Sequence, residues 1–148
     1  GGNVLNRGTG FYFPRAVGTL TIPSTAEKVI SVGAYDSRLN AYADFSGRGS
    51  QYLPIQKPDL VAPGVSITAP TPGGSYTTVT GTSFAAPFVS GSAALLMEWG
   101  IVKGNDPFLY GEKVKAYLRR GAQRVGGYEE YPNVEVGWGR LCLTSSLL

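Results

Sequence analysis

The chain has 148 residues, 43% of them hydrophobic, which is enough for one domain with a buried core. Its net charge is only +3, and the 13 Lys and Arg residues are spread along the sequence, which argues against a nucleic-acid partner. Histidine is absent, so the usual general base near neutral pH and the most common transition-metal ligand are both missing from this chain.

The first third of the chain predicts loops and short strands. Residues 1–20 are rich in glycine and are expected to form a loop, with a short extended segment at 19–22. Residues 28–35 are β-branched and almost continuously apolar, which is typical of a strand buried in a parallel sheet. A shorter strand or extended segment is predicted at 41–46.

The middle of the chain predicts a further strand and a hairpin. Residues 60–62 form a short apolar run that flanking prolines limit in length. Residues 65–68 and 75–79 are expected to pair across the Pro- and Gly-rich turn at 70–74.

The last part of the chain changes to a helical period. Apolar residues three or four apart predict a helix from Ser83 that stops at Gly100, and its many small residues favour tight packing inside the domain. A second helix is predicted at 111–122, with Val114, Tyr117 and Leu118 on its buried side, and the tail at 137–143 alternates like a strand. No linker or repeat divides the chain, so one domain is expected over residues 1–148.

No segment is expected to cross a membrane. The longest strongly apolar run, at 93–97, is far shorter than the roughly 20 residues that a bilayer-spanning helix needs. No charged-then-apolar leader opens the chain, so a soluble segment is expected. The one cysteine, Cys142, cannot form an internal disulfide and is expected to be a small buried hydrophobe.

Ser83 lies where an extended segment passes into a helix. At a helix N-terminus, backbone N–H groups and the positive end of the helix dipole favour negative charge that develops beside the hydroxyl. Gly81 leaves room for a substrate backbone, and Pro87 lies near the first turn, where a missing N–H costs little. A serine here is also an ordinary helix N-cap, so position alone leaves both interpretations open.

The residues around Ser83 favour the first interpretation. Residues 81–91 follow the pattern G-T-S-x-A-x-P-x-V-x-G, which at seven fixed positions resembles the active-site serine signature of the subtilisin-like serine proteases. Four more segments resemble later blocks of that family, in the family's order: 29–34, 44–49, 57–65 and 137–139. The resemblance covers essentially the whole chain and is to the C-terminal half of the family's catalytic domain.

This resemblance implies a subtilisin-like three-layer α/β/α fold with a mainly parallel sheet, of which only the C-terminal part is present. Half of such a sheet would leave an apolar edge and face uncovered. The family carries its catalytic aspartate and histidine well before the Gly-Asn pair that opens this chain. We therefore expect an N-terminal segment or chain of the same protease to cover the sheet and to supply both residues.

The resemblance also implies roles for individual residues. Ser83 would be the acylating nucleophile, and its own N–H would form half of the oxyanion hole. Asn3, about 80 residues earlier, would donate the other half through its side chain. The Gly2 backbone would form one wall of the specificity pocket, Thr21 would lie near its floor, and Thr82 would contact the substrate.

Other features of the family transfer less directly. Ile22–Pro23 falls where many members have a cis peptide bond, although trans is the usual state of an X-Pro bond. Phe88 stands where many members have a histidine that has no triad role. Calcium is possible by family resemblance, but the scattered carboxylates locate no metal ligand, and no other cofactor is identifiable. Secretion from the cell is implied in the same way.

The functional prediction is a serine endopeptidase that cleaves peptide or protein substrates through an acyl-enzyme on Ser83. Its proton acceptor would come from the upstream segment, so the isolated chain is expected to be inactive. The alternative is a catalytically inactive pseudoprotease that binds peptides or proteins. A Ser–Lys hydrolase is a third possibility, but none of its candidate amines lies in a motif that would aim it at Ser83; these are Lys57, Lys103 and Lys113.

Overall fold

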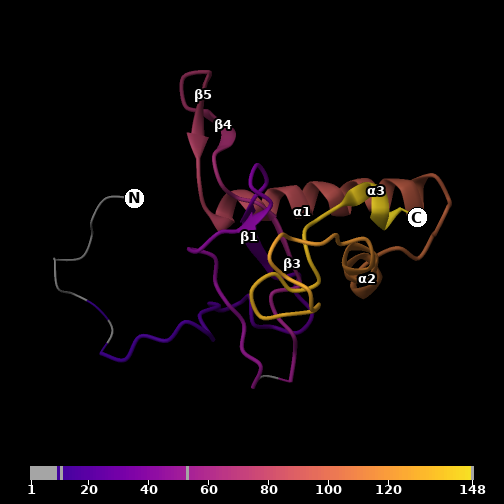
Figure 1. Ribbon diagram of the computed structural model, residues 1–148. Helices are drawn as coiled ribbons and strands as arrows, with labels where there is room; N and C mark the ends of the chain where they lie inside the picture. Colours follow the sequence, from indigo (N-terminus) through magenta and orange to yellow (C-terminus); the bar gives the residue numbers. More distant parts are fainter. Residues whose placement is uncertain (1–9, 11, 53, 148) are drawn as a thin grey trace.

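The computed structural model describes residues 10, 12–52 and 54–147, and Figure 1 shows the order of the elements along the chain. In that order they are β1 (Val32–Asp36), β2 (Ala41–Tyr42), β3 (Leu60–Pro63), β4 (Ile67–Thr71), β5 (Ser75–Val79), α1 (Thr82–Met97), the π-helical continuation η1 (Glu98–Val102), α2 (Glu112–Arg120) and α3 (Leu143–Ser146).

β1 is the central strand of a small sheet with the order β2-β1-β3. Val32 of β1 pairs with Leu60 of β3, while β2 pairs antiparallel with the other edge of β1. Leu60 to Ala62 are fully buried, as expected for a parallel strand, and the strand predicted at 60–62 is confirmed. The strand predicted at 41–46 is reduced to the two residues of β2.

β1 begins four residues later than the predicted strand at 28–35. The carbonyl of Val29 accepts hydrogen bonds from two lysine side chains, and the N–H of Ser31 donates to the Asp59 carboxylate. Because side chains satisfy these backbone groups, the regular strand starts only at Val32. The segment at 19–22 forms no strand either.

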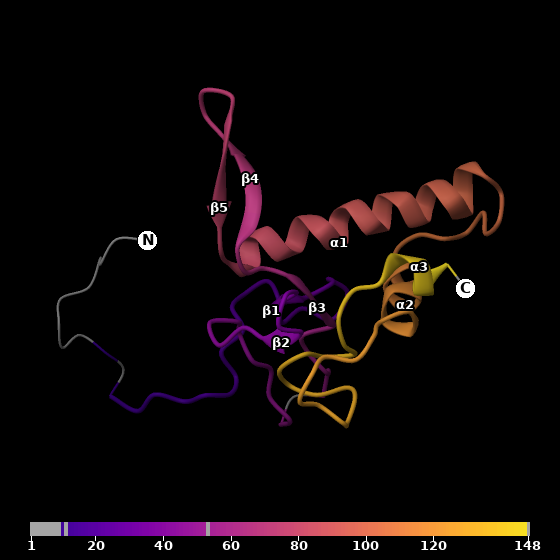
Figure 2. The same cartoon turned by 45° about the horizontal axis from the view of Figure 1, so that its top comes forward.

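β4 and β5 form the predicted hairpin, with pairs from Ile67↔Val79 to Thr71↔Ser75. In Figure 2 the hairpin rises away from the sheet beside the start of α1. Its first strand begins later than predicted, because Ser66 has a φ of 54° and donates its N–H to the Thr80 hydroxyl instead of joining the ladder.

α1 lies along the sheet and packs one of its own faces against it (Figure 2). Its buried residues, Ala85, Val89 and Leu96, pack in one apolar core with β1, β3 and α2. On the uncovered side Phe88 is 43% exposed and Leu95 is 53% exposed. The sequence predicted that this helix packs tightly inside the domain; in the described chain the small sheet covers only one face of the helix, and the opposite face is open.

The sequence predicted that the helix stops at Gly100. In the structure it continues through η1 to Val102. Gly100 is buried, and a Cβ added there would lie 2.6 Å from the Leu109 Cδ2 atom. The carbonyl of Gly100 also accepts a hydrogen bond from the Asp106 N–H at 3.0 Å. Gly100 therefore allows the following loop to pack closely against the helix, and it does not end the helix.

α1 and η1 together give a continuous 21-residue helix with a mean hydropathy of 1.3 over its most apolar window. The expectation that no segment has the length and composition of a membrane span is therefore wrong. A single helix of this kind is weak support for a span, because core helices of globular proteins have the same properties. Only 22% of that window is buried in the described chain, so most of the helix lacks a covering layer here.

The second predicted helix is confirmed as α2, with Val114 and Leu118 buried and Tyr117 half-buried. The strand predicted at 137–143 is wrong: Arg140 makes only isolated bridges to Val61 and Gln123. Gly137 and Gly139 have φ values of 57° and 120°, and these conformations bend the chain out of a strand. Cys142, expected to be buried, is a half-buried free thiol.

The two faces of the central strands are covered differently. α1 and α2 pack on one face, and on the other Tyr35 and Val61 form a small cluster with Val125 and Val136 from the loop after α2. The α/β class that the sequence predicted therefore holds for the described residues.

We expect the substitution Gly100→Ala to lower the free energy of unfolding by about 1–3 kcal/mol, because its methyl group would overlap the Leu109 side chain. Val102→Ala, at a 78% exposed position of the same helix, should change stability by less than about 0.5 kcal/mol. Chemical denaturation of both variants measures the difference, and equal effects would contradict the packing role of Gly100.

Candidate active site

Ser83 occupies the second position of α1, and its side chain is exposed to solvent. The N-cap position is filled by Gly81, and no side chain caps the helix. The interpretation of Ser83 as an ordinary N-cap is therefore wrong. At this position the Ser83 N–H has no partner within the helix, so the exposed hydroxyl lies beside free backbone donors.

Gly64 holds the start of α1 against the carboxyl ends of the two parallel strands. Its N–H donates to the Tyr35 carbonyl at 3.1 Å, and its carbonyl accepts from the Gly81 N–H at 2.8 Å. A Cβ at Gly64 would lie 2.6 Å from the Ala34 Cβ, so only glycine allows this approach. Crevices at the carboxyl ends of parallel strands are where α/β proteins bind ligands, and Ser83 stands at that edge.

A cavity of about 500 Å³ opens beside the N-terminus of α1. Its walls include Thr82 of α1 and residues from two loops, 15–24 and 44–48. Thr21 and Thr82, the two described residues that were predicted to contact substrate, both line this cavity. Ser83 is not part of its lining.

One wall of the cavity is held by a chain of polar contacts that sequence reasoning did not find. Arg48 lies at ion-pair distance from Glu135, 3.0 Å, and its guanidinium stands 5.3 Å from the centre of the Tyr42 ring. Tyr128 donates a hydrogen bond to the same Glu135, and burial together with this contact raises the pKa of Tyr128 above its ordinary value. Sequence offers no signal for this set, because its members meet only through tertiary contacts.

Two predicted residues, Gly2 and Asn3, lie outside the described residues. The Ile22–Pro23 peptide bond, adjacent to the cavity residue Thr21, is cis.

The three lysines considered as partners of a Ser–Lys pair are all engaged with carboxylates. Lys57 contacts Asp59 at 2.8 Å, Lys113 contacts Asp106 at 2.6 Å, and Lys103 lies 3.6 Å from Glu98. None of these pairs involves Ser83, so the structure gives that alternative no support.

Metal ligation is also limited in this part of the molecule. Within residues 10, 12–52 and 54–147, no three Asp, Glu, Cys or His side chains come together as a metal site. Calcium binding stays a prediction.

Known proteins similar to this chain agree on one family. The model of the subtilase family matches residues 2–139. Serine protease AprX of Bacillus subtilis strain 168 is 34% identical over 136 residues, covering 78% of this chain and 29% of AprX. Subtilisin DY of Bacillus licheniformis is 40% identical over 108 residues, covering 73% of this chain and 35% of that protein.

A solved structure is similar over almost the entire chain. The CspB protease of Clostridium perfringens superposes with a TM-score of 0.91 at 49% identity, covering 97% of this chain and 30% of that one. The chain therefore spans about a third of the length of the relatives that it matches.

We expect Gly64→Ala in the complete protein to slow labelling of Ser83 by a fluorophosphonate by up to about 10²-fold, because a shift near 1 Å at a reacting group has effects of that size. The added methyl group would overlap the Ala34 Cβ and displace the N-terminus of α1. The double variant Gly64→Ala with Ala34→Gly removes the clashing atom and should recover part of the rate. Unchanged labelling in the single variant would contradict the role given to Gly64.

Proposed function

Because the chain belongs to the subtilase family of serine proteases, we propose that it is the C-terminal part of an endopeptidase domain and that Ser83 is the nucleophile. The observation that carries this proposal is the exposed Ser83 hydroxyl at the second position of α1, within the serine signature at 81–91. The superposition on the CspB protease confirms the predicted subtilisin-like α/β fold.

In the proposed reaction, the Ser83 hydroxyl oxygen attacks the carbonyl carbon of a peptide bond while a histidine from the upstream part of the protein takes its proton. The carbonyl oxygen becomes negatively charged and accepts hydrogen bonds from the Ser83 N–H and the Asn3 carboxamide. The amine then leaves with the proton held by the histidine. Water hydrolyses the resulting ester and restores the serine.

We assign the cavity beside α1 to the substrate side chain that precedes the cleaved bond. Two observations support this assignment. Thr82, which directly precedes Ser83 in the sequence, lines the cavity, and so does Thr21. The Gly2 backbone would close the remaining wall. By the same family membership we propose an extracellular site of action.

The upstream part of the domain has a surface on which to pack. A groove of about 570 Å³ runs between β4 and the uncovered side of α1, and its lining is almost entirely apolar. Phe84, Phe88 and Leu95 project from α1 into its walls, while Gly91 and Ser92 leave room for a close neighbour. Since this chain covers only 29% of AprX and 30% of the CspB protease, we propose that the rest of the catalytic domain covers this groove.

Ser83→Ala in the complete protein should abolish fluorophosphonate labelling and lower kcat by about 10⁶-fold, the magnitude known for loss of the nucleophile in subtilisin itself. Ser90→Ala is the matched control, because Ser90 is an exposed serine on the same helix. Mass spectrometry of the labelled peptide and a peptidase assay give the two readouts. Labelling that persists in Ser83→Ala would remove Ser83 from this role, and an unlabelled, inactive wild type would favour the pseudoprotease alternative.

Leu95→Asp tests the covered groove. Leu95 is 53% exposed and Leu39 is 75% exposed in this chain, so a charge at either position meets water unless another part of the protein covers it. We expect Leu95→Asp to destabilise the complete protein by about 3 kcal/mol or more through burial of an unpaired charge. Leu39→Asp should cost less than about 0.5 kcal/mol. Equal, small effects on the unfolding free energy would show that the groove is open to solvent.

A further inference from the structure

Three charged residues belong to the described lining of the cavity beside α1: Arg15, Asp44 and Arg48. Arg15 and Asp44 have opposite charges and are both exposed, so water screens them and their effects offset one another. The Arg48 side chain is only 27% exposed. Whether the cavity has a net positive charge therefore depends on what Arg48 contacts.

Backbone hydrogen bonds hold residues 48 and 49 between two other segments. The Thr19 N–H donates to the Arg48 carbonyl at 2.9 Å, and the Arg48 N–H donates to the Thr19 hydroxyl at 2.8 Å. The Gly49 N–H donates to the Val134 carbonyl at 2.8 Å. The position of the Arg48 main chain therefore does not depend on the contacts of its guanidinium.

The Arg48 guanidinium has two neighbours that lie outside the cavity lining. Its Nε lies 3.0 Å from the Glu135 Oε1, and its central carbon lies 5.3 Å from the centre of the Tyr42 ring. Among the described residues the Nε has no hydrogen-bond partner, so its contact with Glu135 is electrostatic. The Glu135 side chain is 28% exposed, and its Oε2 accepts a hydrogen bond from Tyr128. Glu135 thus neutralises Arg48 and is itself held by Tyr128.

The rest of the described lining carries no charge. It supplies apolar groups, such as Leu20 and Phe45, and hydroxyl groups, such as those of Thr21 and Thr82. A hydroxyl can donate to or accept from an uncharged polar side chain, but it cannot neutralise a charged one. The pairing of Arg48 therefore decides how well the cavity accepts an acidic side chain.

We propose that Arg48 and Glu135 form a neutral pair that makes the cavity select uncharged substrate side chains over acidic ones. This inference rests on the proposed function, in which the cavity receives the side chain before the cleaved bond. Arg48 is the specificity-determining residue because it lines the cavity, and Glu135 is a positioning residue that acts through Arg48. Without the Glu135 charge, the guanidinium keeps only the Tyr42 ring as a partner, and a substrate carboxylate can pair with it.

Cleavage of a peptide library by the complete protein tests this pair. The library comes from a digested bacterial proteome, and mass spectrometry identifies the residue before each cleaved bond. We expect the wild type to cleave mainly after uncharged residues. Glu135→Gln keeps the shape of the side chain and an acceptor for Tyr128, and it should raise cleavage after Asp and Glu, relative to uncharged residues, by about tenfold, the size of one hydrogen bond to a charged group.

Two further variants separate charge pairing from a general effect on the fold. Glu129→Gln removes a negative charge from an exposed position of the same loop and should keep the wild-type preference. Arg48→Met combined with Glu135→Gln removes the unpaired cation and should abolish the gain. Cleavage after uncharged residues should stay nearly the same in Glu135→Gln, whereas a disrupted fold would reduce it.

The outcomes distinguish this inference from the proposed function. A wild type that cleaves peptides, with the same preference in Glu135→Gln, would overturn the role of the pair and leave the proposed function intact. A gain that persists in the double variant, or a wild type that prefers acidic residues, would overturn it as well. A wild type that cleaves no peptide and is not labelled at Ser83 would contradict the proposed function itself, and this inference with it.

Discussion

The close approach of Gly64 to Ala34 and Gly81 fixes the geometry on which the rest of this molecule depends. The backbone of Gly64 connects the end of β1 to the start of α1 by hydrogen bonds to Tyr35 and Gly81. A side chain at this position would separate the strands from the helix. Because Ser83 follows Gly81 by two residues, the same contact also determines where its hydroxyl lies.

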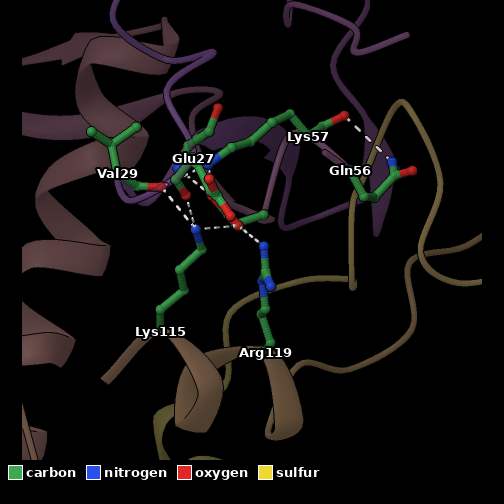
Figure 3. A network of polar contacts seen from close by, with 8 residues as sticks. Glu27, Val29, Gln56, Lys57, Lys115 and Arg119 are labelled. Atoms are coloured by element: carbon green, nitrogen blue, oxygen red, sulfur yellow. Dashed lines mark hydrogen bonds and ion pairs between the residues drawn. The ribbon is translucent and has the colours of Figure 1, made fainter. Parts of the chain in front are cut away.

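Different groups lie at the two ends of the parallel strands. The carboxyl ends carry the exposed serine and the adjoining cavity, while the amino ends carry an ionic cluster around the buried Asp59. The cations that contact Asp59 in this cluster are Lys57, Lys115 and Arg119 (Figure 3). Asp59 connects α2 to the segment before β1 through Arg119 and the Ser31 N–H. Polar contacts thus hold the strands and α2 together at one edge, and the exposed Ser83 lies at the other.

α1 is covered on only one side in the described part of the chain. Its inner face packs on the strands, yet Phe88 and Leu95 on its outer face stay half exposed beside an apolar groove. Burial of apolar surface is the main stabilising contribution to folding, so a helix with this composition is expected to have a second covering layer. The sequence predicted the need for that layer from the incomplete sheet, and the groove identifies where it would lie.

The sequence by itself determined the elements whose signals are local: β3 between its prolines, the hairpin around its Pro- and Gly-rich turn, α2 by its apolar period, and the family through the signature around Ser83. It misjudged Gly100 and the start of β1, because contacts with Leu109 and Asp59 decide the backbone path there. It also misjudged the tail, where the positive φ values of Gly137 and Gly139 bend the chain. Only the tertiary structure brought Thr21 and Thr82 into one cavity and placed three cations around Asp59. The periodicity of apolar residues shows which side of a helix or strand is apolar. It does not show which side chains from other parts of the chain will contact that side, and those tertiary contacts determine where residues pack closely and where charges are buried.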